Sequence, residues 1–220
     1  MADSALDIAV EVVRDRADLA RIVPQWQELA GQALEPNPLY EPWMMLPALE
    51  APGGGELHCC LLWARDPERS DLPARLGGLF PFRREKGYRG LPASALRSWS
   101  HPSWAWELCT PLVSAEGAQQ YVSALLEWLK RDGAAVIEFR HVPRDGGFSA
   151  VLAAALCEHD STVYGEDVAA PAWAGGVGMR NLVLGIGTLG EMWVSMLPIL
   201  NRTKRRLAGA SRSDSRALAA

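Results

Sequence analysis

The sequence predicts an α/β protein in which one mixed sheet carries helices on both faces. Several short segments alternate apolar and polar side chains, which is the period of a strand. Other segments repeat apolar residues at three-four spacing, which is the period of a helix packed on one face. One strand comes first, then two helices, then strands joined by loops, then strands alternating with single helices. This order favours a mixed sheet over a purely parallel or antiparallel one.

The first third of the chain predicts one strand, two helices and a proline-punctuated corner. Asp7–Val13 alternates with period two, and apolar residues from Leu19 to Leu34 then recur at helical spacing. Pro24 lies inside that helical pattern and predicts a kink or a late helix start. After the corner EPNPLYEPW, a short apolar helix is expected from about Glu41 to Leu49.

The middle of the chain predicts an antiparallel pair and the most regular helix. Leu57–Arg65 and Arg75–Phe82 are strand-like and are joined by the polar loop DPERSDLP. The tryptophan-dense stretch LRSWSHPSWAWELCTPLV is interpreted as extended segments that line something. Ala115–Lys130 has a full apolar stripe and ends at Asp132-Gly133, so we expect a helix there.

The last third predicts alternating strands and helices. We expect strands at Ala135–His141, Thr162–Val168 and Asn181–Ile186, and a helix at Phe148–Glu158. Thr188 can cap a final helix from Leu189 onward, before the basic stretch.

Charge is strongly segregated along the chain. The last 20 residues hold six Lys or Arg against one acid, Asp214, and the first 200 hold 16 basic and 25 acidic residues. The formal charge of that larger part is therefore about −9, which argues against nucleic acid as its main partner, because phosphate binding needs a basic face. The basic tail alone could bind nucleic acid or anionic lipid; a solvated helix face is the simpler interpretation.

Several classes of protein are not indicated. The four cysteines and four histidines show no metal-ligand spacing, so we expect no metal. The N-terminus lacks the pattern of a secretory signal, and no apolar stretch approaches the roughly 20 residues of a membrane span. We therefore expect a cytoplasmic protein with no membrane span.

Three stretches resemble a known family in order and spacing. They are NPLYEPWMMLPALE, then LGGLFPFRREKGYRGLPASALRSWSHPSWAWELCTPLV, then the terminal LPILNRTKRRLAG. Across about residues 20 to 208 they are similar to the N-terminal half of the CelD-like (cellulose-biosynthesis type) GNAT acetyltransferases, and the order of elements is that of the GNAT acyltransferase fold. The most specific matches are Asn37-Pro38, Pro42-Trp43, the strand end LFPFRR and Thr110-Pro111-Leu112-Val113.

The resemblance implies a bacterial N-acyltransferase with two GNAT-like halves, which transfers an acetyl group from acetyl-CoA to an amine acceptor. The basic run Arg202–Arg206 matches the helix that links the two halves in that family. We therefore expect a GNAT-like domain at 1–187 and a basic linker helix and tail at 188–220, with the second GNAT half absent from this chain. A link to cellulose rests on the name of the family and on no residue here.

The resemblance places the diphosphate of CoA on the loop before the helix at Ala115–Lys130, where backbone N–H groups at a helix N-terminus can hold an anion. The sequence there, PLVSAEGAQQ, offers only Gly117-Ala118 of the expected glycine-rich pattern. The glycines of Arg84–Gly90 and of Ala174–Met179 fit turns better than phosphate loops, because neither group opens a helix.

Candidate site residues lie in the tryptophan-dense stretch. Acyl transfer from a thioester needs a base for the ammonium proton and a donor for the developing oxyanion, and His101 and Glu107 are the acid/base candidates. Trp99, Trp104 and Trp106 could form the wall of a substrate pocket, with core packing or surface pairing as the structural alternative for all five residues. A second functional hypothesis is a non-catalytic GNAT-like module that binds a partner through its basic tail.

Overall fold

A computed structural model of the 220-residue chain describes most of the protein. The described residues are 6–53, 56–65, 73–90, 92–104, 108–159, 163–168, 177–186, 190–192 and 194–198. Trp106, Glu107, the basic run and the C-terminal tail lie outside this part.

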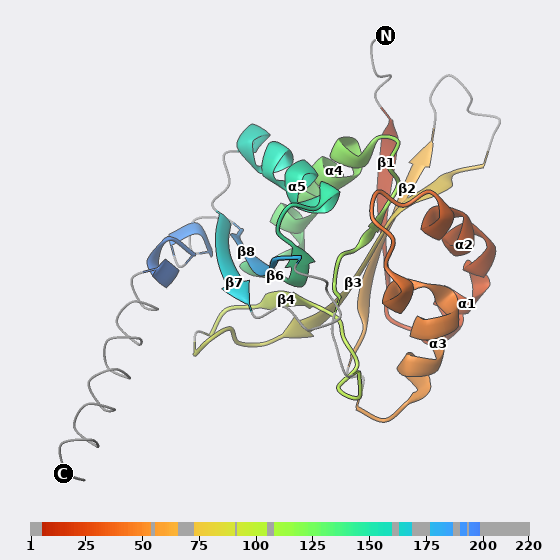
Figure 1. Cartoon of the computed structure of the whole chain (residues 1–220), viewed down its shortest axis with the longest axis horizontal. Helices are drawn as coiled ribbons and strands as arrows, with labels where there is room; N and C mark the ends of the chain where they lie inside the picture. Colours follow the sequence, from red (N-terminus) through yellow and green to blue (C-terminus); the bar gives the residue numbers. More distant parts are fainter. Residues whose placement is uncertain are drawn as a thin grey trace.

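The described residues form one mixed eight-stranded sheet at the centre of the protein (Figure 1). Seven strands follow each other across it in the order β1-β2-β3-β4-β6-β8-β7, and the short β5 also pairs with β3. Only β4 and β6 are parallel among the described strands; each other pair is antiparallel. The strands are β1 Asp7–Val13, β2 His58–Arg65, β3 Arg75–Glu85, β4 Ala95–Ser98, β5 Leu112–Val113, β6 Val136–Pro143, β7 Val163–Val168 and β8 Met179–Gly185.

Helices cover both faces of this sheet, as the sequence predicts (Figure 1). The three N-terminal helices and a short 3-10 turn pack on one face, and two later helices pack on the other. The first group is α1 Arg16–Arg21, α2 Val23–Gly31, η1 Pro38–Tyr40 and α3 Pro42–Glu50; the second is α4 Ala118–Asp132 and α5 Gly147–Glu158.

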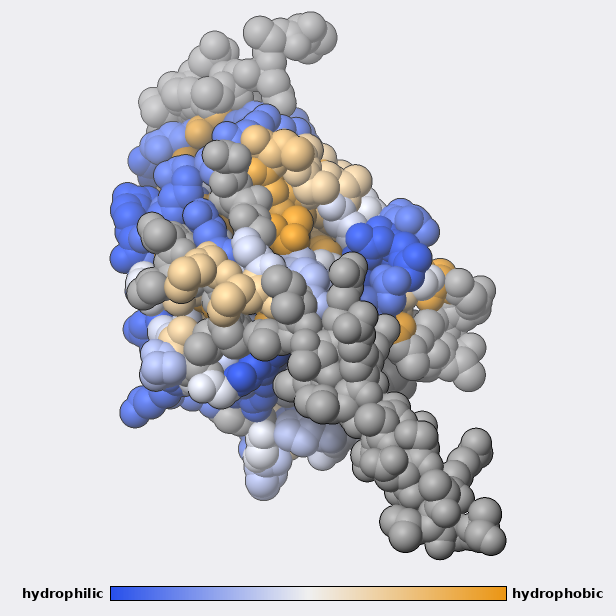
Figure 2. Space-filling model, turned by 90° about the vertical axis from the view of Figure 1, so that its left-hand side faces the viewer, coloured by the Kyte–Doolittle hydropathy of each residue, from blue (hydrophilic) through white to orange (hydrophobic). Residues whose placement is uncertain are grey.

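Residues 190–192 and 194–198 are also helical, and they pack on the face opposite α4 and α5. Val194 and Leu197 are buried there beside Ala95, Val136 and Val183 of three neighbouring strands. Met192 and Met196 are exposed. Figure 2 looks onto the left-hand side of Figure 1, where this helical segment, β7 and α5 lie, and shows hydrophobic surface between hydrophilic areas.

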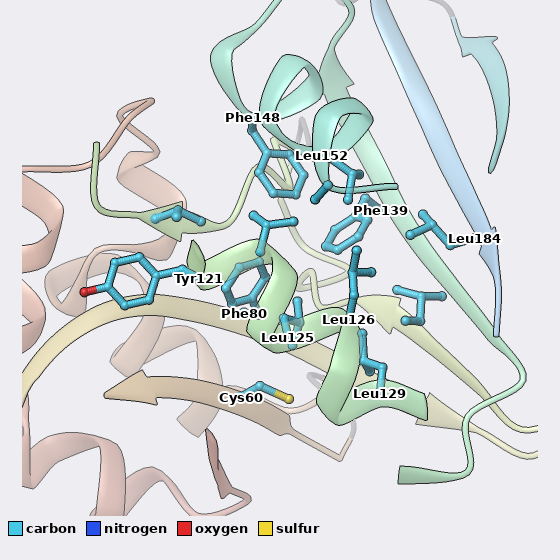
Figure 3. Packing of buried hydrophobic residues seen from close by; sticks show 14 of the residues in the cluster. Cys60, Phe80, Tyr121, Leu125, Leu126, Leu129, Phe139, Phe148, Leu152 and Leu184 are labelled. Atoms are coloured by element: carbon cyan, nitrogen blue, oxygen red, sulfur yellow. The ribbon is translucent and has the colours of Figure 1, made fainter. Parts of the chain in front are cut away.

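Alternation along the strands divides the interior into two main cores. In β2, Cys60 and Leu62 face the core under α4 and α5, whereas Cys59 and Leu61 face the core under α1–α3. A group of aromatic rings fills the first core, with Phe139 in contact with Phe148 of α5 (Figure 3). Each large apolar side chain buried in this way stabilises the fold by about 2 kcal/mol.

The predicted elements are confirmed with small shifts in their bounds where the structure describes them; the predicted cap Thr188 and the helix start Leu189 lie outside the described residues. The expected interruption at Pro24 is real: α1 ends at Arg21, and α2 starts at Val23 with the proline in its first turn, where a missing N–H costs nothing. The tryptophan-dense stretch is only partly extended, since β4 and β5 are its strands and the described residues between them are irregular. The boundary between 187 and 188 stays a prediction.

Among the described residues, no helix combines the length and the apolar character needed to cross a bilayer.

Candidate functional site

The sheet divides where its parallel pair ends. β4 and β6 pair over three residues, from Ala95 opposite Val136 to Arg97 opposite Glu138. Beyond them β5 stays with β3, while β6 has an irregular register between Phe139 and Val142 and continues beside β8. Within β6, His141 has a positive φ of 46°, which marks a sharp local bend. The two halves of the sheet therefore separate at this point, next to the start of α4 and α5.

A buried charge network holds the parallel pair together just before the strands separate. Glu138 is 4% exposed, and its Oε2 accepts a hydrogen bond from Arg97 Nε at 2.6 Å. Its Oε1 accepts from the Tyr88 hydroxyl at 3.2 Å and lies 3.4 Å from Arg89 Nη2. Burial raises the pKa of the Tyr88 hydroxyl, so this group stays a neutral donor.

Helix α4 begins beside this division with an open N-terminus. Gly117, with φ of 74°, precedes the helix in a left-handed conformation that favours glycine. No described side chain caps the helix, and its first turn holds no acid. The first N–H groups of α4 therefore keep their partial positive charge, which can attract an anion. Leu6 lies alongside, with its backbone N–H donating to Gln120 Oε1 at 2.9 Å.

Helix α5 has the opposite arrangement, because its N-terminus already holds an anion of the chain itself. The Glu35 carboxylate accepts a hydrogen bond from the Phe148 backbone N–H at 2.9 Å. Gly146 provides the space: a Cβ at this position would lie 2.2 Å from Glu35 Oε1. Beside this contact is a groove of about 570 Å³ bordered by Pro36 and Gly178.

The segment before Glu35 also occupies the outer edge of β5. Leu34 N–H donates to Val113 C=O at 2.7 Å, and Ala115 N–H donates to Gln32 C=O at 3.0 Å. Ala33 forms an isolated antiparallel bridge with Ser114. Residues 32–35 therefore lie along β5 on the side away from β3, between the two separated halves of the sheet.

The structure brings together three of the five predicted site residues. Trp99 and Trp104 meet edge to face with ring centroids 5.3 Å apart, and His101 is 6.5 Å from Trp104. His101 is 4% exposed, and its Nδ1 accepts from Ser103 N–H at 3.1 Å, which places the ring proton on Nε2. His101 Nε2 has no hydrogen-bond partner among the described residues.

Trp99 is only 1% exposed and belongs to the core under α1–α3. Packing in this core is therefore the role that the structure shows for Trp99. Trp106 and Glu107 lie outside the described residues. The catalytic and pocket-lining roles proposed for the five residues stay predictions.

Asn37 has a role that the motif alone did not reveal. Its Nδ2 donates to Leu108 C=O at 2.9 Å and to Thr110 C=O at 2.7 Å, while its Oδ1 accepts from Leu39 N–H. One buried amide therefore joins the corner before α3 to the end of the tryptophan-dense stretch. Two of the motifs on which the resemblance rests, Asn37-Pro38 and Thr110-Pro111, meet in space.

No group of three or more His, Cys, Asp or Glu side chains able to hold a metal occurs in the part of the chain that the structure describes.

Comparisons with known proteins give likenesses of fold only. No family model matches the sequence, and no curated protein matches it. An acetyltransferase of Bacillus subtilis solved in complex with CoA is 16% identical, covers 82% of this chain and 99% of its own, and has a TM-score of 0.37. The Salmonella typhimurium protein yncA, described as an acetyltransferase and solved with acetyl-CoA, is 13% identical, covers 80% and 91%, and also has a TM-score of 0.37.

Proposed function

We propose that this chain is a GNAT-type N-acyltransferase domain that uses acetyl-CoA as donor and an amine as acceptor. The open N-terminus of α4 carries the proposal. Its first backbone N–H groups have no side-chain cap, and no acid in its first turn opposes an anion. The diphosphate of CoA is an anion of the required kind.

The chemistry needs few groups from the protein. A base would first take one proton from the ammonium group, so that the neutral amine nitrogen can form a bond to the thioester carbonyl carbon. The carbon–sulfur bond then breaks, and a second proton lost by the nitrogen passes to the sulfur, so CoA leaves as the thiol. His101 and Glu107 are the proposed acid/base residues, and Trp99, Trp104 and Trp106 are the proposed walls of the acceptor pocket. The acceptor itself is proposed only as an amine.

Calorimetric titration with acetyl-CoA tests the proposal, with a matched pair of variants at Gln119. This exposed residue is in the first turn of α4, and its Nε2 donates to Glu158. Gln119→Glu should weaken binding and Gln119→Lys should strengthen it, each about three- to fivefold, because a charge in the first turn adds to or opposes the helix dipole. A chain that folds and binds no acetyl-CoA would contradict autonomous cofactor binding.

A second candidate is a non-catalytic GNAT-like module, and one observation favours it. Residues 32–35 cover the edge of β5, and Glu35 fills the N-terminus of α5, so much of the division between the sheet halves is taken by the chain itself. In this case the titration gives no heat, although the wild-type and Gln119 variants are all folded.

The finer assignment is to the CelD-like subtype, in which this domain works with a second GNAT half in the cytoplasm. The resemblance supports it, as do the exposed Met192 and Met196 on the helix that leads toward the basic run. The gene sequence downstream tests it: a second GNAT-like half, in the same or another frame, is the expected finding. An unrelated downstream sequence would contradict the subtype.

A further inference from the structure

Strand β1 has an edge that no other described strand covers. Among the described strands it is the first in the order of the sheet, and it pairs there only with β2. Its pairing runs without a register shift from Asp7 opposite Arg65 to Val13 opposite Cys59. Alternate residues of such an edge direct N–H and C=O groups away from the sheet. The strand contains neither a proline nor a bulge, which are devices that protect exposed edges.

A groove follows this edge. It has a volume of about 780 Å³ and lies between residues 8–10 of β1 and the helix α4, whose contributing residues are Ala124, Glu127, Trp128, Arg131 and Asp132. Ile8, Val10 and Val12 pack against the core under α4, yet all three are only half-buried. Helix α4 therefore covers the apolar face of β1 incompletely.

The charges of β1 select one register for pairing with a second copy of itself. In an antiparallel pair related by a two-fold axis at Val10, all seven residues pair. Val10 then faces its own copy, and Ile8 faces Val12, which extends the apolar face. On the other face Asp7 lies opposite Val13 and Ala9 opposite Glu11, so no acid directly opposes an acid.

The neighbouring registers are disfavoured. An axis at Ala9 places Asp7 opposite Glu11 of the other copy, and an axis at Glu11 places that residue opposite itself. Like charges directly opposite each other destabilise a strand pair. The register with its axis at Val10 therefore pairs the most residues and places no acid directly opposite another acid.

We propose that two copies of this chain join through β1 in this register and form one continuous sheet. The two-fold axis places both α4 helices on the same face, so the groove of each copy is closed by the other. Trp128 then becomes a central buried aromatic of the interface, a residue type that often carries binding energy. The groove carries both signs of charge, on Arg131 and on Glu127 and Asp132.

The assembly state of the full chain is the first test. Sedimentation velocity over a micromolar concentration series should show a species of twice the chain mass of 24.0 kDa. A chain that stays monomeric at every concentration overturns the proposal. The free edge of β1 would then be open to a strand of a different protein.

Two substitutions at Ala9 test the register. Ala9 is exposed, so neither change disturbs a buried position. Ala9→Glu places an acid opposite Glu11 of the other copy, and Ala9→Lys places a base there. Because the axis repeats each pair, we expect the dimer Kd to rise roughly three- to tenfold with glutamate and to fall by a similar factor with lysine. Equal effects of the two charges would overturn the register.

A charge on the axis tests the interface itself. Val10→Lys places two ammonium groups opposite each other and should abolish the dimer. Val163→Lys is the matched control, because Val163 is 42% exposed on β7 at the other end of the sheet. Circular dichroism checks that both variants fold. A dimer that is lost with Val163→Lys, or retained in a folded Val10→Lys, contradicts the proposal.

Discussion

Glu35 and Phe148 join two parts of the chain that are far apart in sequence. The Glu35 carboxylate accepts from the first-turn N–H of Phe148 at 2.9 Å, and the residues just before Glu35 pair with β5 and with the segment that follows it. One short segment therefore connects the N-terminal helices, the start of α4 and the start of α5. This contact supplies the cap that α5 lacks locally, since its own N-cap residue is Gly146.

Loss of this cap should destabilise the protein measurably. Glu35→Ala removes both the acceptor and the charge, and we expect the free energy of unfolding to fall by about 1 to 2 kcal/mol. Glu35→Gln keeps an acceptor and should lose about half as much. Urea denaturation measures both, with Glu28→Ala on the exposed side of α2 as control. Equal stability of Glu35→Ala and the control would show that the contact contributes nothing.

Tyr121 lies directly over Gly77, and this contact allows no side chain on the glycine. A Cβ at Gly77 would be 1.8 Å from the Tyr121 ring. We expect Gly77→Ala to cost several kcal/mol, because both the ring and the β3 backbone are buried.

A double variant separates this clash from a general loss of stability. Tyr121→Leu should recover part of the stability of Gly77→Ala, which thermal denaturation of all four combinations measures. Gly31→Ala is the matched control, since nothing lies within 4 Å of its Cβ position and it should stabilise α2 by about 0.5 to 1 kcal/mol. Strictly additive effects of Gly77→Ala and Tyr121→Leu would contradict the clash.

Replacement of Asn37 by aspartate should destabilise the protein. Asn37→Asp replaces two N–H donors by an oxygen that faces the carbonyls of Leu108 and Thr110 in a buried site. Because unpaired buried polar groups cost about 1 to 3 kcal/mol each, we expect a loss of at least about 2 kcal/mol in unfolding free energy. Asn181→Asp is a useful comparison, since that side chain accepts from His141 N–H and an aspartate still can. Similar losses at the two positions would be evidence against the donor role of Asn37.

The sequence predicted those elements whose pattern is local. The stripe of α4 and the alternation of β2 are set by neighbouring residues, and both appear within a few residues of their expected bounds. β5 has only two residues, and it exists through its pairing with Gly78 and Leu79, which no local pattern reveals.

The site was less predictable because it depends on distant contacts. Glu35 lies between a leucine and a proline without any capping motif. The signal that could have found it was at α5, where Gly146 precedes and Gly147 begins a helix that has no Ser, Thr, Asp or Asn as its N-cap. A helix without a local N-cap side chain needs a hydrogen-bond acceptor from elsewhere in the chain. The local sequence does not indicate which residue supplies it. The roles of Asn37 were hidden in the same way, although its motif was recognised.

His58 should make the stability of the protein depend on pH in acid. Its imidazole is buried beside the Trp128 ring, and its Nε2 lies 3.9 Å from Asp132 Oδ1. Burial, followed by the positive charge of Arg84, lowers the pKa of His58 from 6.5 to about 4; Arg14 lowers it further, whereas Asp132 and Glu56 oppose the shift.

The direction of this pH dependence is set by which state of the protein, folded or unfolded, binds the proton on His58 more readily. Above pH 6.5 the imidazole is neutral in both states and contributes no pH dependence. Between pH 6.5 and about 4 the unfolded chain takes up a proton that the folded protein excludes, so the free energy of unfolding falls as the pH falls. Below about pH 4 the loss is complete, at roughly 3 kcal/mol.

Urea titrations of the wild type and of His58→Gln from pH 7.5 to 3.5 measure this contribution. Carboxylates also titrate in this range, but they do so in both proteins, so the difference between the two curves isolates His58. We expect that difference to change by roughly 3 kcal/mol in favour of the variant as the pH falls. His159→Gln controls for the loss of a histidine elsewhere. Parallel curves for the wild type and His58→Gln would mean that His58 takes up its proton equally well in the folded protein, against the burial seen in the structure.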